Sequence, residues 1–137
     1  MIRQPLSLQG KSALVVDDTS EIATLVAEVL GGYGAKVTVA NDGADAMEMM
    51  QFRHYHLVLL DIMMPPPDGL TVLKFMQSRR PELIRQTVVM TAYCYSKDVQ
   101  LILTEGQINC LFKPFDLKEL YAVAHKIVFQ DDPIVAA

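Results

Sequence analysis

Five short apolar runs alternate with amphipathic stretches along this chain, and no other feature of the sequence constrains its fold as strongly. The runs cover residues 13–16, 36–40, 57–60, 87–90 and 108–112. Such short, mostly apolar runs are typical of strands that are buried on both faces of a parallel sheet. In the second run Val37 and Val39 alternate with polar neighbours, so we expect that strand at an edge of the sheet.

The stretches between the runs carry apolar residues at helical spacing. In the first stretch they repeat at i, i+3, i+4, i+7 and i+8, and they are Ile22, Leu25, Val26, Val29 and Leu30. Asn41-Asp42 is expected to open the second helix, and the last helix is expected to start with a capping arrangement at Asp116 and to bury Leu117. Five such strand–helix units predict an α/β fold, a doubly wound five-stranded parallel sheet with five helices on its two faces.

Length and composition fit one small domain. The chain has 137 residues, of which 51% are hydrophobic and 20% charged, and this composition excludes a disordered chain. We expect an N-terminal extension over residues 1–10, a domain over 11–129 and a frayed tail over 130–137. There is no room for a separate effector domain, so the output is expected to pass through a downstream target protein or a domain missing from this sequence.

Charge and cysteine content exclude several other classes of protein. The net charge is -4 and the basic residues are scattered, so we expect no direct binding of nucleic acid. Cys94 and Cys110 are too few for a disulfide framework or a zinc quartet, and we expect both to stay reduced, as in a cytosol. No apolar run resembles a signal peptide or a membrane span, so a cytoplasmic protein without membrane contact is expected.

Polar residues follow four of the predicted strands at the same point. Asp17 and Asp18 follow the first strand, Asp61 the third, Thr91 the fourth and Lys113 the fifth. In open α/β sheets, ligands bind outside the carboxyl ends of the strands, where the strand order reverses. If the order is 2-1-3-4-5, that point lies between the first and third strands, and the aspartates meet there.

The residue types gathered at this edge indicate phosphoryl chemistry. Carboxylates that are brought together repel one another and favour a bound cation, and a few oxygen ligands with room for water suit Mg²⁺. Lys113 adds positive charge, and the Thr91 hydroxyl can donate to a phosphoryl oxygen. Carboxylate, metal, lysine and hydroxyl are together the groups needed to transfer a phosphoryl group onto an aspartate.

Four motifs carry a resemblance to a known family. In order and at family spacing, they are Leu14-Val15-Val16-Asp17-Asp18, Leu59-Leu60-Asp61-Ile62-Met63-Met64-Pro65 with Asp68-Gly69, Val89-Met90-Thr91-Ala92 and Lys113-Pro114-Phe115. Over residues 11–128 the chain resembles the receiver domain of two-component response regulators. The resemblance implies a flavodoxin-like fold and a domain that promotes only its own phosphorylation and dephosphorylation, rather than an enzyme.

The resemblance also implies roles for the acidic residues. Asp61 is expected to accept a phosphoryl group from a histidine kinase or a histidine phosphotransfer protein. Asp18, Asp61 and the backbone carbonyl of Met63 are expected to bind Mg²⁺ directly, with Asp17 acting nearby through water. A homodimer is compatible with this reading.

Further roles follow for the later motifs. Thr91 and Lys113 are expected to hold the phosphoryl oxygens, and the bond before Pro114 is expected to be cis. The family usually has an aromatic switch residue three positions before the lysine, where this chain has Cys110. We therefore expect a weaker coupling of Thr91 to that position, or a response through Tyr93 or Tyr95.

Two other functions compete with this reading. A phosphatase of the haloacid-dehalogenase type also uses an aspartyl nucleophile and Mg²⁺, but it needs a second aspartate two residues later, where this chain has Met63. A receiver-like scaffold that is never phosphorylated is the other alternative, and the retained Asp18, Asp61, Thr91 and Lys113 argue against it.

Overall fold

Five parallel strands form one sheet in the computed structural model, which describes residues 7–92 and 96–131. The strands are β1 (Ser12–Val16), β2 (Lys36–Ala40), β3 (Leu57–Asp61), β4 (Thr87–Thr91) and β5 (Asn109–Phe112). Their order is β2-β1-β3-β4-β5, which confirms the predicted topology. β2 lies at an edge and its side chains are mostly partly exposed, as its alternating pattern predicts.

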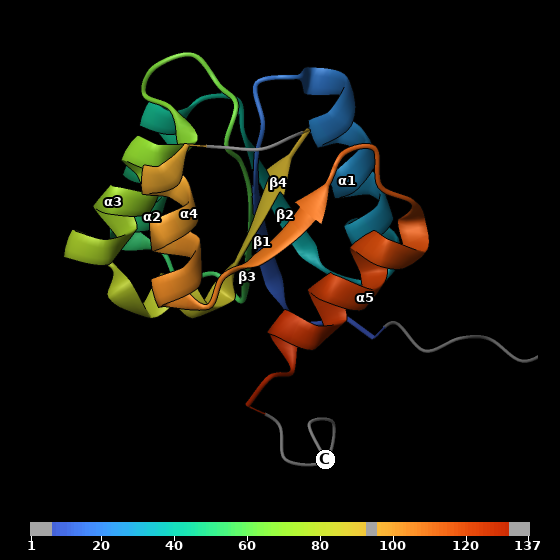
Figure 1. The fold of residues 1–137 in the computed structure, drawn as a ribbon. Coiled ribbons are helices and arrows are strands. Elements are labelled where there is room, and N and C mark those ends of the chain that lie inside the picture. Colours follow the sequence, from blue (N-terminus) through green and yellow to red (C-terminus); the bar gives the residue numbers. More distant parts are fainter. Residues whose placement is uncertain (1–6, 93–95, 132–137) are drawn as a thin grey trace, which may run out of the picture.

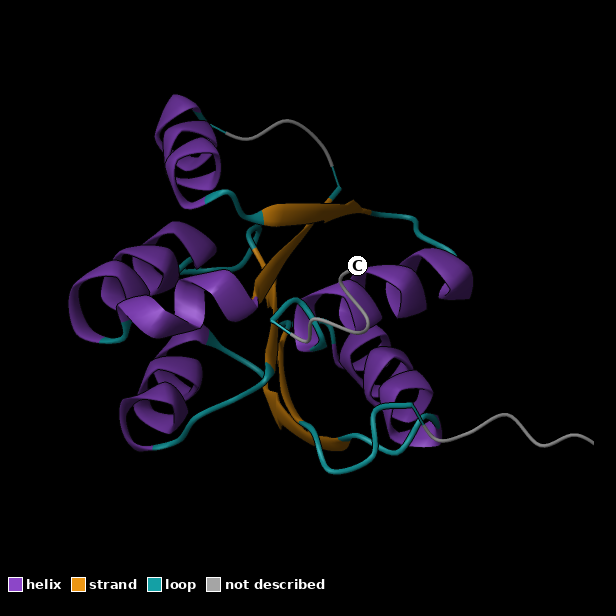
Figure 2. Ribbon diagram, turned by 90° about the horizontal axis from the view of Figure 1, so that it is seen from below, coloured by secondary structure: helices purple, strands orange, loops and turns teal. Residues whose placement is uncertain are grey.

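Helices cover both faces of the sheet. They are α1 (Ser20–Gly32), α2 (Gly43–Phe52), α3 (Gly69–Arg79), α4 (Lys97–Gly106) and α5 (Leu117–Val128). α2, α3 and α4 lie on one face and α1 and α5 on the other (Figures 1 and 2). A short 3₁₀ helix, η1 (Pro81–Gln86), connects α3 to β4 and was not predicted.

The sheet separates two apolar clusters because successive side chains of a strand point to opposite faces. Val58 and Leu60 of β3 pack in the cluster under α2, α3 and α4. Leu57 and Leu59 of the same strand pack in the cluster under α1 and α5. All five residues of β3 are buried, which explains why this central strand has no polar residue before Asp61.

Side-chain caps begin most of the helices. The predicted start of α2 is confirmed, since Asp42 Oδ1 accepts the Asp45 amide at 2.8 Å. The predicted arrangement at Asp116 is a complete capping box with Glu119. Thr19 precedes α1 but makes no side-chain cap bond. These caps fix where each helix leaves the carboxyl edge of the sheet.

Two leucines depart from the sequence-based expectation. Leu25 is 50% exposed and Leu117 is 51% exposed, although both were expected on buried helix faces. The buried stripe of α1 is Ala23, Val26 and Leu30, so the helical period turns Leu25 away from the sheet. Leu117 lies in the first turn of α5, outside the core cluster of that helix.

Both described ends of the chain pack against the domain. Leu8, from the predicted extension, is buried, and its amide donates to the Tyr33 carbonyl at 2.8 Å. Asp131, from the predicted tail, pairs with Arg85 of η1 at 2.8 Å. Residues 1–6 and 132–137 lie outside the described part of the chain.

His56 joins the starts of β1 and β3 at the opposite edge of the sheet. The Ser12 amide donates to His56 Nδ1 at 3.0 Å, and the His56 amide donates to the Ser12 carbonyl at 2.9 Å. Nδ1 can accept this bond only when it carries no proton. Burial, with smaller contributions from Lys11 and His54, lowers the pKa of His56 below its ordinary value of 6.5.

A pH-dependent stability follows from the lowered pKa of His56. An unfolded His56 takes up a proton near pH 6.5, whereas the folded residue takes it up only at lower pH. The free energy of unfolding is therefore highest above pH 6.5 and decreases as the pH falls towards the pKa of the folded His56. We measure the free energy of unfolding in urea between about pH 5 and 8. We expect His56→Asn to reduce its dependence on pH, and we expect His54→Asn to keep most of that dependence. Parallel curves for the wild type and His56→Asn would contradict the assignment.

Candidate functional site

The polar residues singled out by the sequence converge at the carboxyl edge of the sheet. Asp17 and Asp18 directly follow β1, and Lys113 directly follows β5. Asp61 and Thr91 were predicted to follow their strands. They are instead the last residues of β3 and β4, since each strand extends one residue further than predicted. The Lys113 amide donates to the Thr91 carbonyl at 2.7 Å and so ties the last two strand ends together.

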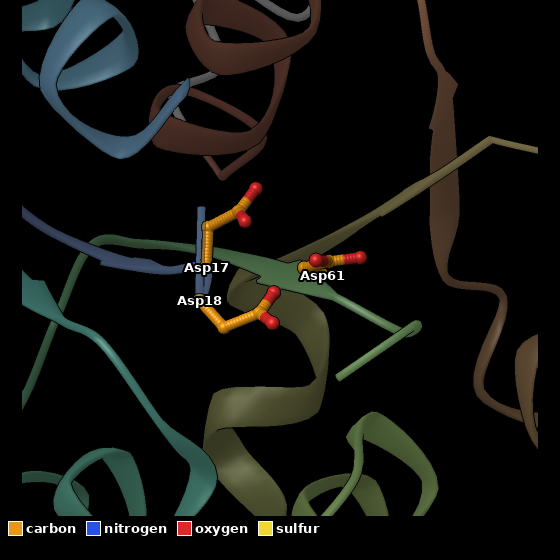
Figure 3. Close-up of side chains that lie close together, drawn as sticks. All are labelled: Asp17, Asp18 and Asp61. Carbon is orange, nitrogen blue, oxygen red and sulfur yellow. The ribbon is translucent and has the colours of Figure 1, made fainter. Parts of the chain in front are cut away.

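Three carboxylates form the centre of the site (Figure 3). One oxygen each of Asp17, Asp18 and Asp61 lies within 4.8 Å of the other two. Asp17 and Asp61 are buried, whereas Asp18 is exposed. The cluster therefore has a buried floor and one side that is open to water.

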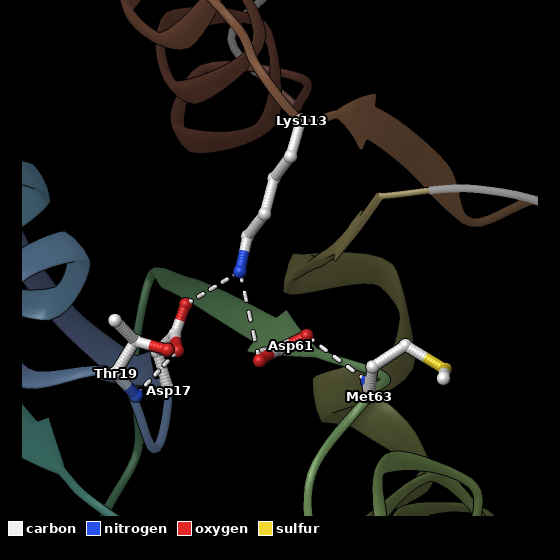
Figure 4. A network of polar contacts seen from close by, with 5 residues as sticks. All are labelled: Asp17, Thr19, Asp61, Met63 and Lys113. Carbon is white, nitrogen blue, oxygen red and sulfur yellow. Dashed lines mark hydrogen bonds and ion pairs between the residues drawn. The ribbon is translucent and has the colours of Figure 1, made fainter.

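Lys113 reaches the two buried carboxylates from above (Figure 4). Its Nζ lies 2.9 Å from Asp17 Oδ2 and 3.6 Å from Asp61 Oδ2. Removing Lys113 would leave two buried carboxylates without a compensating charge, so both acids depend on this lysine. The closer partner is Asp17, which leaves Asp61 less strongly paired.

Backbone amides fix the orientation of both buried carboxylates. The Thr19 amide donates to Asp17 Oδ1 at 2.9 Å, and the Met63 amide donates to Asp61 Oδ1 at 3.0 Å. Neither bond was predicted from the sequence. The signal is an aspartate followed two residues later by its donor, the spacing of an Asx turn.

The charge on Asp61 is costly in this environment. Burial raises the pKa of Asp61 from 3.8 to about 6, and Asp17 adds to the rise, while the Met63 amide and Lys113 oppose it. A cation at the cluster favours the ionised form, because an opposite charge within a few ångströms stabilises a carboxylate.

The donor atoms fit a hard divalent cation. All three side chains offer oxygen, and the exposed Asp18 leaves space for water ligands. Mg²⁺ binds through a few carboxylates and keeps several waters, whereas zinc sites prefer nitrogen and sulfur. The residues present are therefore compatible with Mg²⁺.

The loop of residues 62–68, which we name the acceptor loop, connects Asp61 to α3. Asp68 Oδ1 caps α3 by accepting the Thr71 amide at 2.9 Å, and this bond lowers the pKa of Asp68. The Gly69 amide donates to the Ile62 carbonyl at 3.3 Å, which closes the loop. The Lys113–Pro114 and Pro66–Pro67 bonds are cis.

The two predicted switch positions lie on neighbouring strands. Thr91 is buried at the end of β4, and Cys110 is half-buried in β5 opposite Val89. Cys110 packs against the cluster under α2, α3 and α4. Tyr93, Cys94 and Tyr95 lie outside the described residues, so the expected response through either tyrosine stays a prediction.

Comparison with known proteins identifies the family. Residues 13–125 match the profile of the response regulator receiver domain. The chain belongs to this family. It is thus the receiver domain of a two-component response regulator, and its flavodoxin-like fold is that of its structural neighbours. The match over residues 13–125 favours the receiver over the phosphatase alternative. Receiver domains are not classical enzymes.

Curated and solved relatives agree with this assignment. The transcriptional regulatory protein ZraR of Escherichia coli O157:H7 is 33% identical over 130 residues, which are 90% of this chain and 29% of that protein. The Francisella response regulator 1452 receiver domain superposes with a TM-score of 0.76 at 27% identity, over 90% of this chain and 100% of that one. NtrX from Brucella abortus gives a TM-score of 0.79 at 27% identity, over 93% of this chain and 29% of that one.

The receiver spans about a quarter of the length of the curated relatives that it matches. Within residues 7–92 and 96–131, no helix is long and apolar enough to cross a membrane.

Proposed function

We propose that this receiver accepts a phosphoryl group on Asp61 from a phosphohistidine of a histidine kinase or a histidine phosphotransfer protein. The observation that carries the proposal is the position of Lys113 Nζ between the buried Asp17 and Asp61 carboxylates. That arrangement supplies a nucleophile and a positive charge at one point. It argues against a scaffold that is never phosphorylated, because a buried charge cluster is costly to keep without a use.

The step is an in-line displacement. A carboxylate oxygen of Asp61 forms a bond to phosphorus while the bond from phosphorus to the donor imidazole nitrogen breaks. The nitrogen keeps the electron pair and takes up a proton. Lys113 and the Thr91 hydroxyl are proposed to hold the phosphoryl oxygens, which carry the developing charge.

Asp18, Asp61 and the Met63 carbonyl are the residues that would hold Mg²⁺ directly, with Asp17 acting through water. When bound, the ion supplies positive charge that offsets the repulsion between the carboxylates and the phosphoryl group. The Met63 amide keeps Asp61 oriented through its bond to Oδ1.

The output is proposed to leave the domain through protein contacts. Thr91 and Cys110 are the proposed switch positions, and the occupant of the output surface is a target protein, an effector domain or a second copy of the chain. Relatives such as ZraR are named transcriptional regulators, so an effector domain in a longer protein is one form of this output. We place the unit in the cytoplasm, with the receiver over residues 11–129.

Labelled phosphotransfer tests the proposal. The chain is mixed with phosphorylated histidine kinases, with Mg²⁺ or with EDTA, and bound label is counted. We expect transfer from at least one kinase that reaches about one phosphoryl group per chain and is lost in EDTA. A chain that takes up no label from any kinase or from acetyl phosphate would support the scaffold instead.

An apolar groove beside Lys113 is the proposed docking face for the phosphodonor protein. The groove has a volume of about 340 Å³ and is lined by Ile22, Leu25, Ala92, Lys113, Pro114 and Phe115. Leu25 is 50% exposed and lies beside Ile22, Pro114 and Phe115 in the groove lining, so the apolar surface is contiguous there, as in sites that bind a partner. Lys113 lines the groove and its Nζ lies 3.6 Å from Asp61 Oδ2, so a partner bound in the groove would lie close to Asp61.

A variant in this groove separates docking from chemistry. Leu25→Glu should slow transfer from the kinase about 10-fold or more, since it places a charge in a desolvated contact. Phosphorylation by acetyl phosphate should stay within about 2-fold, because the small donor needs no docking surface. Leu101→Glu, on α4, is the control. Equal transfer rates for the Leu25→Glu and wild-type chains would exclude this face.

A further inference from the structure

We propose that Gly43, the first residue of α2, is a positioning residue for the acceptor loop. Its missing side chain lets α2 seat directly on the backbone of Pro67, and this contact keeps Met63 in place beside Asp61. The inference rests on the proposed function, because it concerns the same phosphoryl and Mg²⁺ site.

The contact between Gly43 and the loop has no room for a further carbon atom. A Cβ at Gly43 would lie 2.3 Å from the Pro67 carbonyl oxygen and 3.1 Å from both the Pro67 carbonyl carbon and Val72 Cγ2. Ordinary van der Waals contacts begin at 3.4 Å. The crowded atom belongs to the backbone, so it cannot rotate away as a flexible side chain could.

Close approach, rather than backbone conformation, explains the glycine. The φ angle of Gly43 lies outside the left-handed region, so other residues can adopt its backbone conformation. Gly31 and Gly32 of α1 are also helical, and a Cβ at either would have no neighbour within 4 Å. These two residues provide matched controls.

α2 cannot easily move away from the loop. Ala46 and Met50, on the same helix, are fully buried in the core. The N-terminus of α2 is fixed by the Asp42 cap, and Gly43 itself is buried. An added carbon would therefore displace the loop rather than the helix.

The loop transmits this displacement towards Asp61. Pro65, Pro66 and Pro67 each have a fixed φ, so the segment is stiff. A Cβ at Gly69, the first residue of α3, would lie 2.5 Å from Ile62 Cα, so the two ends of the loop are tightly packed against each other. The remaining part of the loop includes Met63, whose amide orients the Asp61 carboxylate.

Substitution of Gly43 by alanine tests the inference. We expect Gly43→Ala to shift the amide signal of Met63 in the metal-free protein and to weaken Mg²⁺ binding about 10-fold or more, as for other residues that orient metal ligands. Binding is followed by NMR titration, which reports the folded protein only. Gly32→Ala should bind Mg²⁺ as the wild type does. An unshifted Met63 amide, or wild-type Mg²⁺ affinity in Gly43→Ala, would overturn the inference.

A second variant distinguishes positioning from a loss of stability. In Gly43→Ala/Pro66→Gly, a flexible residue can absorb the displacement before it reaches Met63. We expect Mg²⁺ affinity to recover towards the wild-type value although the glycine makes the fold less stable. If the double variant binds no better than Gly43→Ala, the inference is wrong. If the wild type binds no Mg²⁺, the proposed function fails, while the metal-free Met63 signal still tests the positioning.

Discussion

Asp61→Asn should abolish phosphorylation of this receiver by every donor. The carboxamide is neutral and a poor nucleophile, so we expect uptake to fall by about 10³-fold or more, as when a nucleophile is removed from other sites. Both a histidine kinase and acetyl phosphate should show the loss, because the change acts on the chemistry and not on docking. Label uptake per chain is the measurement.

The same variant should fold at least as well as the wild type. Asp61 is buried next to Asp17, and a neutral side chain removes the repulsion between the two carboxylates. Lys113 keeps its closer partner, Asp17. Urea unfolding therefore serves as the folding control, and Asp45→Asn, on the exposed side of α2, controls for the substitution type. If the Asp61→Asn variant still takes up label at the wild-type rate, Asp61 is not the phosphoryl acceptor.

Asp18→Ala should weaken Mg²⁺ binding without unfolding the domain. Asp18 is the exposed member of the carboxylate cluster, so its removal deletes a proposed ligand and leaves the buried core intact. We expect the affinity to fall at least about 10-fold, since even outer-shell changes have that effect. The free energy of unfolding without metal should change by less than about 0.5 kcal/mol. Calorimetric Mg²⁺ titration measures the affinity.

A nearby acidic residue separates ligation from general charge. Glu21→Ala removes the same charge from the first turn of α1, at a residue that does not belong to the cluster. Its Mg²⁺ affinity should stay within about 2-fold of the wild-type value, since exposed charges are screened by solvent. An equal loss in both variants would indicate a diffuse electrostatic effect and would contradict direct ligation by Asp18.

The layers, the strand order and the edge that carries the site were all predictable from the sequence. Strands such as β3 are buried on both faces, so their apolar runs are visible without any structure. Parallel strands bring their carboxyl ends to one edge of the sheet. Residues as far apart in the sequence as Asp17 and Lys113 are therefore expected to lie close together. Local pattern and topology agree at this edge.

Details that depend on tertiary contacts were not predictable. Leu25 belongs to the apolar repeat of α1, yet the neighbouring Val26 faces the sheet and Leu25 does not. The preference of Lys113 for Asp17 over Asp61 is a difference of less than 1 Å between two acids of the same type. Gly43 is an ordinary residue in the sequence, and only the approach of Pro67 explains it.

Locating the phosphoryl group tests the central claim most directly. The receiver is phosphorylated with Mg²⁺ present, the acyl phosphate is reduced with borohydride, and the modified residue is identified by mass spectrometry of its peptides. We predict that the modification lies on Asp61 alone and disappears when Mg²⁺ is removed. Modification of Asp17, Asp18 or a histidine in place of Asp61 would contradict the account.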